Sequence, residues 1–359
     1  MQDEWRKYNR TLFFGSSRSY HRNHEKCPLN CLICSSNGGI PYPNELTFYE
    51  LKRIIDDAHE LGTRTVIFSG GEPFEHTCLI ELCEHAKSND LGVCIYTSGN
   101  VSDKDCSTKP IDESTLSYLR KIPINKMIFG LQGPNEEVHD SITRVRGSFS
   151  NTMISIKRVV RESIPTEIHF VPVKMNYRTL PQMIELAKKL KVDKISVLRF
   201  VAHGRGKANN SILKLEPDEQ LVLKSILREM LASKTPCIRI GAPFNTFELL
   251  EGSYCTAGKT RATIRADGFA FPCEAMKELQ HCLDNDLHRR SLKEVWEESA
   301  IFRESRNFVF IISKSLCRSC EKFAQCKGGC PAQRFLSGVS MVDHGDPYCL
   351  ATEVAIKNA

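Results

Sequence analysis

Short runs of β-branched and aromatic residues alternate with helical patterns between residue 11 and about residue 205. This alternation is typical of βα units built around a parallel sheet. The runs that we expect to form strands are Thr11–Ser19, Arg64–Ser69, Gly92–Thr97, Lys126–Leu131, Thr166–Pro172 and Lys194–Phe200. Six units are fewer than the eight of a closed (β/α) barrel. The pattern therefore predicts an α/β fold with a partial barrel or an open sheet.

The helix after the first strand has the clearest boundaries. Thr47 and Glu50 form a capping-box pattern, and Gly62 is a typical residue just past a helix end. Between them, the apolar residues that share one face are Leu51, Ile54, Ile55, Ala58 and Leu61. We assign this face to the protein core. Further helical patterns lie at Glu216–Ser233 and Leu292–Glu298.

The composition excludes several classes of protein. The chain has 359 residues, of which 41% are hydrophobic and 26% charged, as in globular proteins of two or three domains. No apolar run approaches the ~18 residues that a membrane helix needs. Residues 1–20 place acidic and basic residues before a short Leu-Phe-Phe cluster and do not resemble a secretory signal. We therefore expect a cytoplasmic protein that does not enter a membrane.

Cysteine is the residue type that departs most from ordinary usage. The chain has 16 cysteines, and in a reducing cytoplasm so many thiols are more typical of metal ligands than of disulfides. The net charge of +6 comes without a long run of Lys or Arg. We therefore do not expect nucleic acid to be the primary partner.

Three of the cysteines follow the first expected strand in a CxxxCxxC loop, namely Cys27, Cys31 and Cys34. A structural zinc site has four ligands, and an ordinary [4Fe–4S] cluster has four thiolates. A cluster held by only three thiolates leaves one iron open to another ligand. The alternative is a zinc site that His21 or His24 completes.

The second expected strand ends in the sequence Ser-Gly-Gly-Glu-Pro, residues 69–73. Ligands bind at the carboxyl ends of parallel strands, and paired glycines allow close approach to the backbone there. Together with the CxxxCxxC loop, this segment makes the chain resemble the radical S-adenosylmethionine (SAM) enzyme superfamily. The resemblance implies a partial (β/α)6 barrel and a catalytic cluster on the three cysteines, and it makes zinc the weaker alternative. It also implies that the amino group of SAM binds at Gly70, Gly71, Glu72 and Pro73.

Two weaker matches follow later strands. Ser98 stands in a turn that resembles the family's Thr-Asn-Gly turn beside the cofactor, where Asn is commoner. Arg199 lies in the segment where related enzymes contact the adenosine of SAM. The chain departs from the family at Ile33, where an aromatic residue or His is usual, so packing against the adenine is expected to differ.

The C-terminal part holds seven further cysteines at ligand-like spacing. A CxxC pair, two more thiols and a Pro resemble a ferredoxin loop, in which the last cysteine can serve a second cluster. The whole pattern resembles the SPASM domain of radical SAM enzymes. By that resemblance an outer auxiliary cluster is held by Cys317, Cys320, Cys326 and Cys349, and an inner one by Cys255, Cys273 and Cys330. We divide the chain into an N-terminal extension (1–20), a barrel (21–235), a connector (236–253) and a small iron–sulfur cluster domain (254–359).

The inner cluster has one ligand too few in this assignment. Its fourth iron is open to substrate, or Cys282 or His281 closes it, and the sequence leaves both hypotheses standing. Glu274, next to Cys273, is a candidate proton acceptor in an oxidative reaction. The expected cofactors are three [4Fe–4S] clusters and SAM.

The resemblance implies reductive cleavage of SAM to a 5′-deoxyadenosyl radical, which abstracts hydrogen from a substrate. Enzymes with this layout mostly modify peptides or proteins by thioether or carbon–carbon crosslinks, epimerisation or oxidation, so a peptide maturase is the first hypothesis. The alternatives are an enzyme that acts on a small molecule or a tetrapyrrole side chain, and a non-catalytic iron–sulfur electron carrier. The expected partners are a peptide or protein substrate, a separate leader-recognition protein, and a reductase, flavodoxin or ferredoxin as electron donor.

Overall fold

The structure is a computed structural model that describes residues 10–16, 27–39, 42–104, 107–231, 237–247, 249, 255–278, 283–312 and 315–350. Its centre is a nine-stranded sheet with the order β11-β10-β1-β2-β3-β6-β7-β8-β9. Neighbouring strands run parallel except β10 and β11, and β4 and β5 form a separate antiparallel pair. The strands are β1 (Arg10–Ser16), β2 (Thr63–Gly70), β3 (Gly92–Thr97), β4 (Asn100–Ser102), β5 (Thr108–Pro110), β6 (Lys126–Gly130), β7 (Thr166–Phe170), β8 (Lys194–Val197), β9 (Cys237–Ile240), β10 (Arg261–Ile264) and β11 (Ala270–Phe271).

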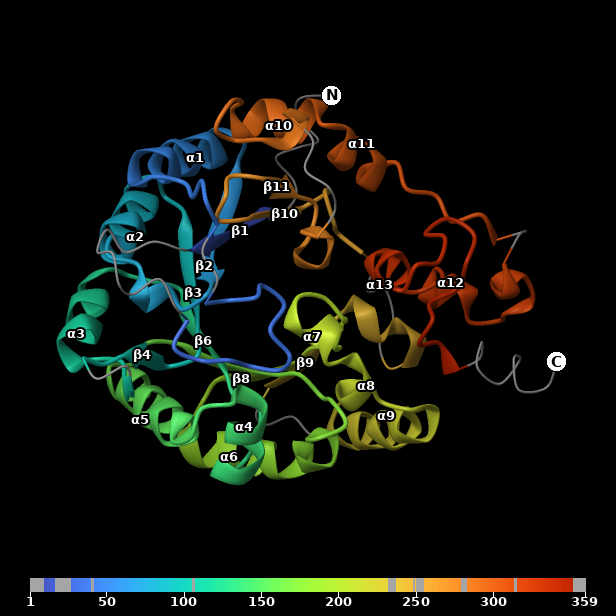
Figure 1. Ribbon diagram of the computed structural model, residues 1–359, viewed down its shortest axis with the longest axis horizontal. Helices are drawn as coiled ribbons and strands as arrows, with labels where there is room; N and C mark the ends of the chain where they lie inside the picture. The colour runs from blue at the N-terminus through green and yellow to red at the C-terminus, as the bar shows by residue number, and fades with distance from the viewer. Residues whose placement is uncertain are drawn as a thin grey trace.

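Helices cover the outer side of this curved sheet, and the C-terminal segment lies at one side of it (Figure 1). No helix in the described parts of the chain is both long and apolar enough to cross a lipid bilayer. The helices are α1 (Phe48–Glu60), α2 (Leu79–Ser88), α3 (Glu113–Lys121), α4 (Glu136–Thr143), α5 (Ser148–Arg161), α6 (Leu180–Leu190), α7 (Arg205–Ala208), α8 (Asn210–Leu213), α9 (Pro217–Leu231), α10 (Leu292–Glu298), α11 (Ala300–Arg306), α12 (Phe323–Cys326) and α13 (Pro331–Leu336).

Helix α1 forms as its sequence predicts. The Thr47 hydroxyl accepts a hydrogen bond from the Glu50 amide, and the Glu50 carboxylate accepts one from the Thr47 amide. Both bonds satisfy amides that the first turn of a helix leaves without an intrahelical acceptor. The predicted apolar face is buried at Leu51, Ile54, Ile55 and Ala58.

Alternate residues of each strand face two different environments. In β2, Val66 and Phe68 pack in the large core between the sheet and the helices, whereas Ile67 belongs to a small apolar cluster on the other face. That small cluster also contains Cys94 of β3 and Ile128 of β6. Because side chains alternate along a strand, the second face is the inside of the partial barrel.

All six predicted strands are present, and β3 has the predicted ends, whereas the ends of the other five differ. Predicted residues 17–19 of the first strand lie outside the described residues, and β8 ends at Val197 rather than at residue 200. The prediction missed three strands of the main sheet. Strand β9 lies in the predicted connector, and β10 and β11 lie in the predicted C-terminal domain. The sheet therefore continues across both predicted boundaries.

Candidate active site and iron–sulfur centres

Cys27, Cys31 and Cys34 lie in the loop between β1 and α1, against the carboxyl end of β2. Gly38 marks the contact, since a Cβ there would lie 3.2 Å from the Cβ of Cys27 and 3.4 Å from the Cα of Gly71. The fold thus brings together the two motifs on which the resemblance rests, at the end of the sheet where parallel-strand proteins bind ligands.

Backbone and arginine contacts hold the cysteine loop in place. The Leu32 amide donates to the Ile142 carbonyl at the end of α4 over 2.8 Å. From the first residue of α7, Arg205 donates through Nε to the carbonyl of Cys31 at 3.1 Å and through Nη1 to that of Gly38 at 2.7 Å. Sequence reasoning did not single out Arg205, because its partners are backbone carbonyls that no motif records.

The loop thiols affect one another electrostatically. Burial, with smaller contributions from the charges of Glu72 and Cys34, raises the pKa of Cys27 to about 12. Burial, followed by the charges of Cys27 and Cys34, raises the pKa of Cys31 well above its usual range. Thiols that oppose one another's ionisation in this way gain a strong stabilising interaction when a cation binds and displaces their protons.

Glu72 is a carboxylate enclosed by donors. It is 3% exposed and accepts hydrogen bonds from the Thr97 hydroxyl at 2.6 Å, the Ser98 hydroxyl at 2.7 Å and the Ser98 amide at 2.8 Å. The Phe74 amide, in the turn Pro73–Glu75, adds a fourth bond at 3.3 Å. Burial raises the pKa of Glu72 to about 7, against the lowering effect of these donors.

The structure places Ser98 against Glu72, so this side chain links the end of β3 to the end of β2. Gly70 is the last residue of β2, with a φ of 117°, a region that favours glycine. Pro73 is buried in the turn after it. Sequence reasoning placed Thr97 in the same turn as Ser98 but did not find its bond to Glu72, which depends on the pairing of β2 with β3.

A lysine joins the cysteine loop to the C-terminal segment. Lys277 donates to the Ser36 hydroxyl at 2.6 Å and to the Glu274 carboxylate at 2.8 Å. Although burial opposes ionisation, Lys277 lowers the pKa of Glu274. Glu274 is therefore held as a carboxylate between the cysteine loop and the neighbouring Cys273, and its side chain is 40% exposed.

Cys255, Cys273 and Cys330 come together from three separate segments. Burial, with smaller contributions from the charges of Cys330 and Cys255, raises the pKa of Cys273 to about 12. Burial and the nearby Asp346 raise the pKa of Cys330 to about 11, and Cys255 contributes again. These are the three thiols that the resemblance assigns to the inner cluster. Cys282 and His281, the candidates for a fourth ligand, lie outside the described residues.

A second group forms around the loop 317–326 and Cys349. Burial raises the pKa of Cys326 to about 12, with contributions from Cys349 and Cys317. Burial also raises the pKa of Cys317, and Cys349 and Cys320 add to it. The thiols gathered here are the four that the resemblance assigns to the outer cluster.

The donor sets fit iron–sulfur clusters. All three groups consist of thiols, the ligands that such clusters use. Within the described ranges, no three His, Cys, Asp or Glu side chains surround the position of a single metal ion. His21 and His24, either of which would complete the alternative zinc site, lie outside those ranges.

Arg199 is paired with a carboxylate of the C-terminal segment. Its guanidinium forms a two-pronged ion pair with Asp346, at 2.8 and 2.6 Å, and both side chains are buried. It also lies 5.4 Å from the centre of the Tyr348 ring. The Arg199 side chain thus contacts the C-terminal segment, and its contact with the adenosine of SAM stays a prediction.

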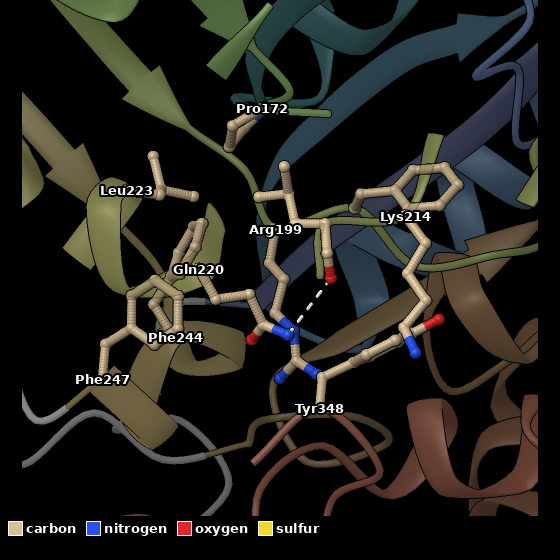
Figure 2. Close-up of a pocket in the computed structure, with 10 residues that line it drawn as sticks. Pro172, Arg199, Lys214, Gln220, Leu223, Phe244, Phe247 and Tyr348 are labelled. Carbon is tan, nitrogen blue, oxygen red and sulfur yellow. Dashed lines mark hydrogen bonds between the residues drawn. The ribbon is translucent and has the colours of Figure 1, made fainter. Parts of the chain in front are cut away.

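Arg199 and Tyr348 line a pocket between the barrel and the C-terminal segment, beside Gln220 of α9 (Figure 2). Gln220 donates to the Leu215 carbonyl at 3.3 Å across this pocket (Figure 2). Lys214 lies over the Tyr348 ring, 4.9 Å from its centre. The remaining walls are apolar, formed by Pro172, Phe200, Leu223, Phe244 and Phe247.

A polar network on the inner face of the barrel was not predicted. Glu167 of β7 accepts from Lys126 of β6 at 2.5 Å and from the His169 ring at 2.9 Å, and it also bonds to Ser196 of β8. His169 in turn bonds to the Tyr96 hydroxyl. These residues stand at alternate positions of neighbouring strands, a relation that becomes visible only once the strand register is known.

Comparison with known proteins agrees with this architecture. The Radical SAM superfamily model matches residues 24–196, and the SPASM iron–sulfur cluster-binding domain model matches residues 255–327. The AdoMet-dependent heme synthase of Methanosarcina barkeri is 24% identical over 346 residues, covering 90% of this chain and 93% of that protein. The PqqA peptide cyclase of Granulibacter bethesdensis is 26% identical over 331 residues, covering 90% and 84%.

Among solved structures, Streptococcus suis SuiB bound to the precursor peptide SuiA has a TM-score of 0.75 at 20% identity, covering 95% of this chain and 76% of that chain. The chain belongs to the radical SAM superfamily and carries a SPASM domain. It is an enzyme, and its two domains imply [4Fe–4S] clusters and SAM as cofactors.

Proposed function

We propose that the protein is a radical SAM peptide maturase that joins or oxidises residues of a peptide substrate. The observation that carries the proposal is that the fold gathers the thiols into three groups. One is the cysteine loop beside Glu72, and the other two are the inner and outer groups of the C-terminal part. Peptide substrates are supported by the similarity to a peptide cyclase and to a structure with a bound precursor peptide. The electron-carrier hypothesis is not retained, because the protein is an enzyme.

We assign a cluster with an open iron to Cys27, Cys31 and Cys34. We also assign the binding of the SAM ammonium group to Glu72, two residues after β2, and the hydrogen bonds from Thr97 and Ser98 support this by orienting its carboxylate. When bound, this cluster and SAM supply a radical that removes a hydrogen atom from the substrate. Gly70, Gly71 and Pro73 shape the backbone around the carboxylate.

We assign two auxiliary [4Fe–4S] clusters to the C-terminal thiols, three clusters in all. The outer group offers four thiols and the inner group three, so the inner site needs one further ligand from the chain or from the substrate. Glu274 stands between the cysteine loop and the inner group, held there by Lys277. It is a candidate acceptor for a proton lost by the substrate.

A second candidate function is the modification of a tetrapyrrole side chain. It is favoured by the similarity to an AdoMet-dependent heme synthase over 93% of that protein's length. Anaerobic incubation of the reconstituted enzyme with each substrate class, followed by mass spectrometry, separates the two functions. We expect peptides encoded next to this gene to lose hydrogen mass and a tetrapyrrole to be returned unchanged. Loss of a carboxyl group from the tetrapyrrole alone would reverse that order.

Replacement of Cys27, Cys31 and Cys34 by Ala tests the assignment of the catalytic cluster. We expect the triple variant to form no 5′-deoxyadenosine from SAM and dithionite, and to hold roughly eight of twelve irons, because the auxiliary thiols remain. Cys237→Ala is the matched control, since Cys237 is exposed and outside all three groups. Continued cleavage of SAM by the triple variant would place the catalytic cluster elsewhere.

A further inference from the structure

Arg334 of α13 is an unusually placed charge. Its side chain is 0% exposed, and it is the largest of the fully buried side chains. Its Nη1 donates to the Gly328 carbonyl. Its Nε and Nη2 have no hydrogen-bond partner within the part of the chain that the structure describes. An arginine cannot lose its charge in a protein, and a buried charge requires a counter-charge.

The nearest carboxylate does not supply that counter-charge. Asp346 accepts two bonds from Arg199 and one each from the amides of Cys330 and Tyr348, at 2.6 to 3.0 Å. Its negative charge is therefore already balanced by Arg199. Asp346 acts on Arg334 only through space, with no bond between the two side chains among those observed.

Aromatic rings do not satisfy the unpaired Nε and Nη2 groups of Arg334 either. The guanidinium of Arg334 lies 4.8 Å from the centre of the Phe310 ring and 5.5 Å from that of Phe308. Aromatic rings attract the guanidinium cation when it lies over the ring. They offer no acceptor for N–H groups at its edge, where Nε and Nη2 point.

The other charges that act on Arg334 are the thiols of Cys330, Cys317 and Cys326. The first belongs to the inner group and the other two to the outer group, so Arg334 lies between the proposed auxiliary clusters. Neutral thiols would leave the cation uncompensated. Thiolates in a cluster are anionic, and their sulfurs accept hydrogen bonds.

We propose that Arg334 is the buried counter-charge of the auxiliary iron–sulfur clusters and raises their reduction potentials. The inference rests on the proposed function, because it requires clusters at these thiols. A cluster gains negative charge on reduction, so a fixed positive charge beside it favours the reduced state. Arg334 would thereby make the auxiliary clusters better acceptors for the electron that the substrate radical gives up.

The test measures potentials in full-length protein that lacks the barrel cluster. In the Cys27, Cys31 and Cys34 to Ala background, the auxiliary clusters are the only ones left, and a redox titration followed by electron paramagnetic resonance gives their midpoints. Arg334→Met removes the charge at similar volume, and Arg334→Lys keeps it. Arg178→Met is the control, since Arg178 is an exposed barrel residue stacked on Tyr177 at 5.1 Å.

We expect Arg334→Met to shift the auxiliary midpoint to more negative potential, with Arg334→Lys and the Arg178 control close to the parent. Loss of auxiliary iron in the Met variant but not in the Lys variant also supports the proposal. An unchanged midpoint with full iron overturns it, and so does equal loss of iron in both Arg334 variants, because packing alone would then explain the residue. Absence of auxiliary iron in the parent would refute the cluster assignment instead.

Discussion

The hydroxyl of Ser98 donates to Glu72 at 2.7 Å, so Ser98→Ala should alter SAM binding through Glu72. A hydrogen bond to a charged group stabilises it by roughly 1.5–3 kcal/mol. One pKa unit corresponds to about 1.4 kcal/mol. Loss of this bond should therefore raise the pKa of Glu72 from about 7 by roughly one to two units.

The consequence for SAM affinity depends on pH. The ammonium group of SAM pairs with the carboxylate form of Glu72, and acidification through the pKa removes that form. At pH 6 the variant should bind SAM roughly 10- to 100-fold more weakly than the parent, because both carboxyl groups are mostly protonated and the pKa values differ by one to two units. By about pH 9.5 both are ionised and the two affinities should nearly coincide.

The assay is equilibrium binding of SAM to the fully reconstituted, oxidised enzyme, in which the cofactor is not cleaved. The ratio of the two affinities at each pH cancels the titration of the cofactor's own amino group. Ser88→Ala is a suitable control, because Ser88 is an exposed residue whose hydroxyl donates to the His85 carbonyl at 2.8 Å. A ratio that stays constant from pH 6 to 9.5 would refute the reasoning and indicate that Ser98 contacts SAM directly.

Two further variants test how the centres are held. Gly204→Ala should deplete the barrel cluster of iron, because its Cβ would lie 2.6 Å from the Cys34 carbonyl oxygen, whereas Gly62→Ala, with a similar positive φ and no atom within 4 Å, should retain it. Equal iron in both would contradict the packing argument. Arg199→Met should lower the free energy of unfolding by about 3–5 kcal/mol in denaturant titrations, because it leaves Asp346 buried without its partner. A loss below about 1 kcal/mol would show that the pair contributes little.

The sequence predicted the elements whose signals are local. The cap of α1 involves residues three apart, and its apolar face repeats with the helical period, so both could be read directly. The cysteine motifs were equally visible, because thiols are rare and their spacing within each loop is short. Family models then confirmed the two domains that those motifs indicated.

Strands β9, β10 and β11 were missed because they are short and lie outside the regular βα alternation. Strand β10 has four residues, and its place in the sheet comes from pairing with β1, some 250 positions earlier in the chain. Only tertiary pairing makes such a segment a strand. The bond from Thr97 to Glu72 also depends on tertiary pairing, because it forms only when β2 and β3 are neighbours.

Arg199 shows most clearly where motif reasoning ends. Its position after β8 predicts contact with the cofactor, which stays a prediction. The motif gave no information on its ion pair, because an arginine reaches several ångströms and pairs with whichever carboxylate the fold brings near. Here that carboxylate is Asp346, whose backbone carbonyl also accepts from the Cys349 amide and whose side chain accepts from the Cys330 amide. One ion pair therefore connects the end of β8 to a proposed ligand of each auxiliary cluster. The barrel positions the C-terminal thiols through Arg199, just as the C-terminal segment positions the cysteine loop through Lys277. Each domain thus contributes a charged side chain that contacts the proposed site of the other, and neither Arg199 nor Lys277 belongs to a cysteine motif.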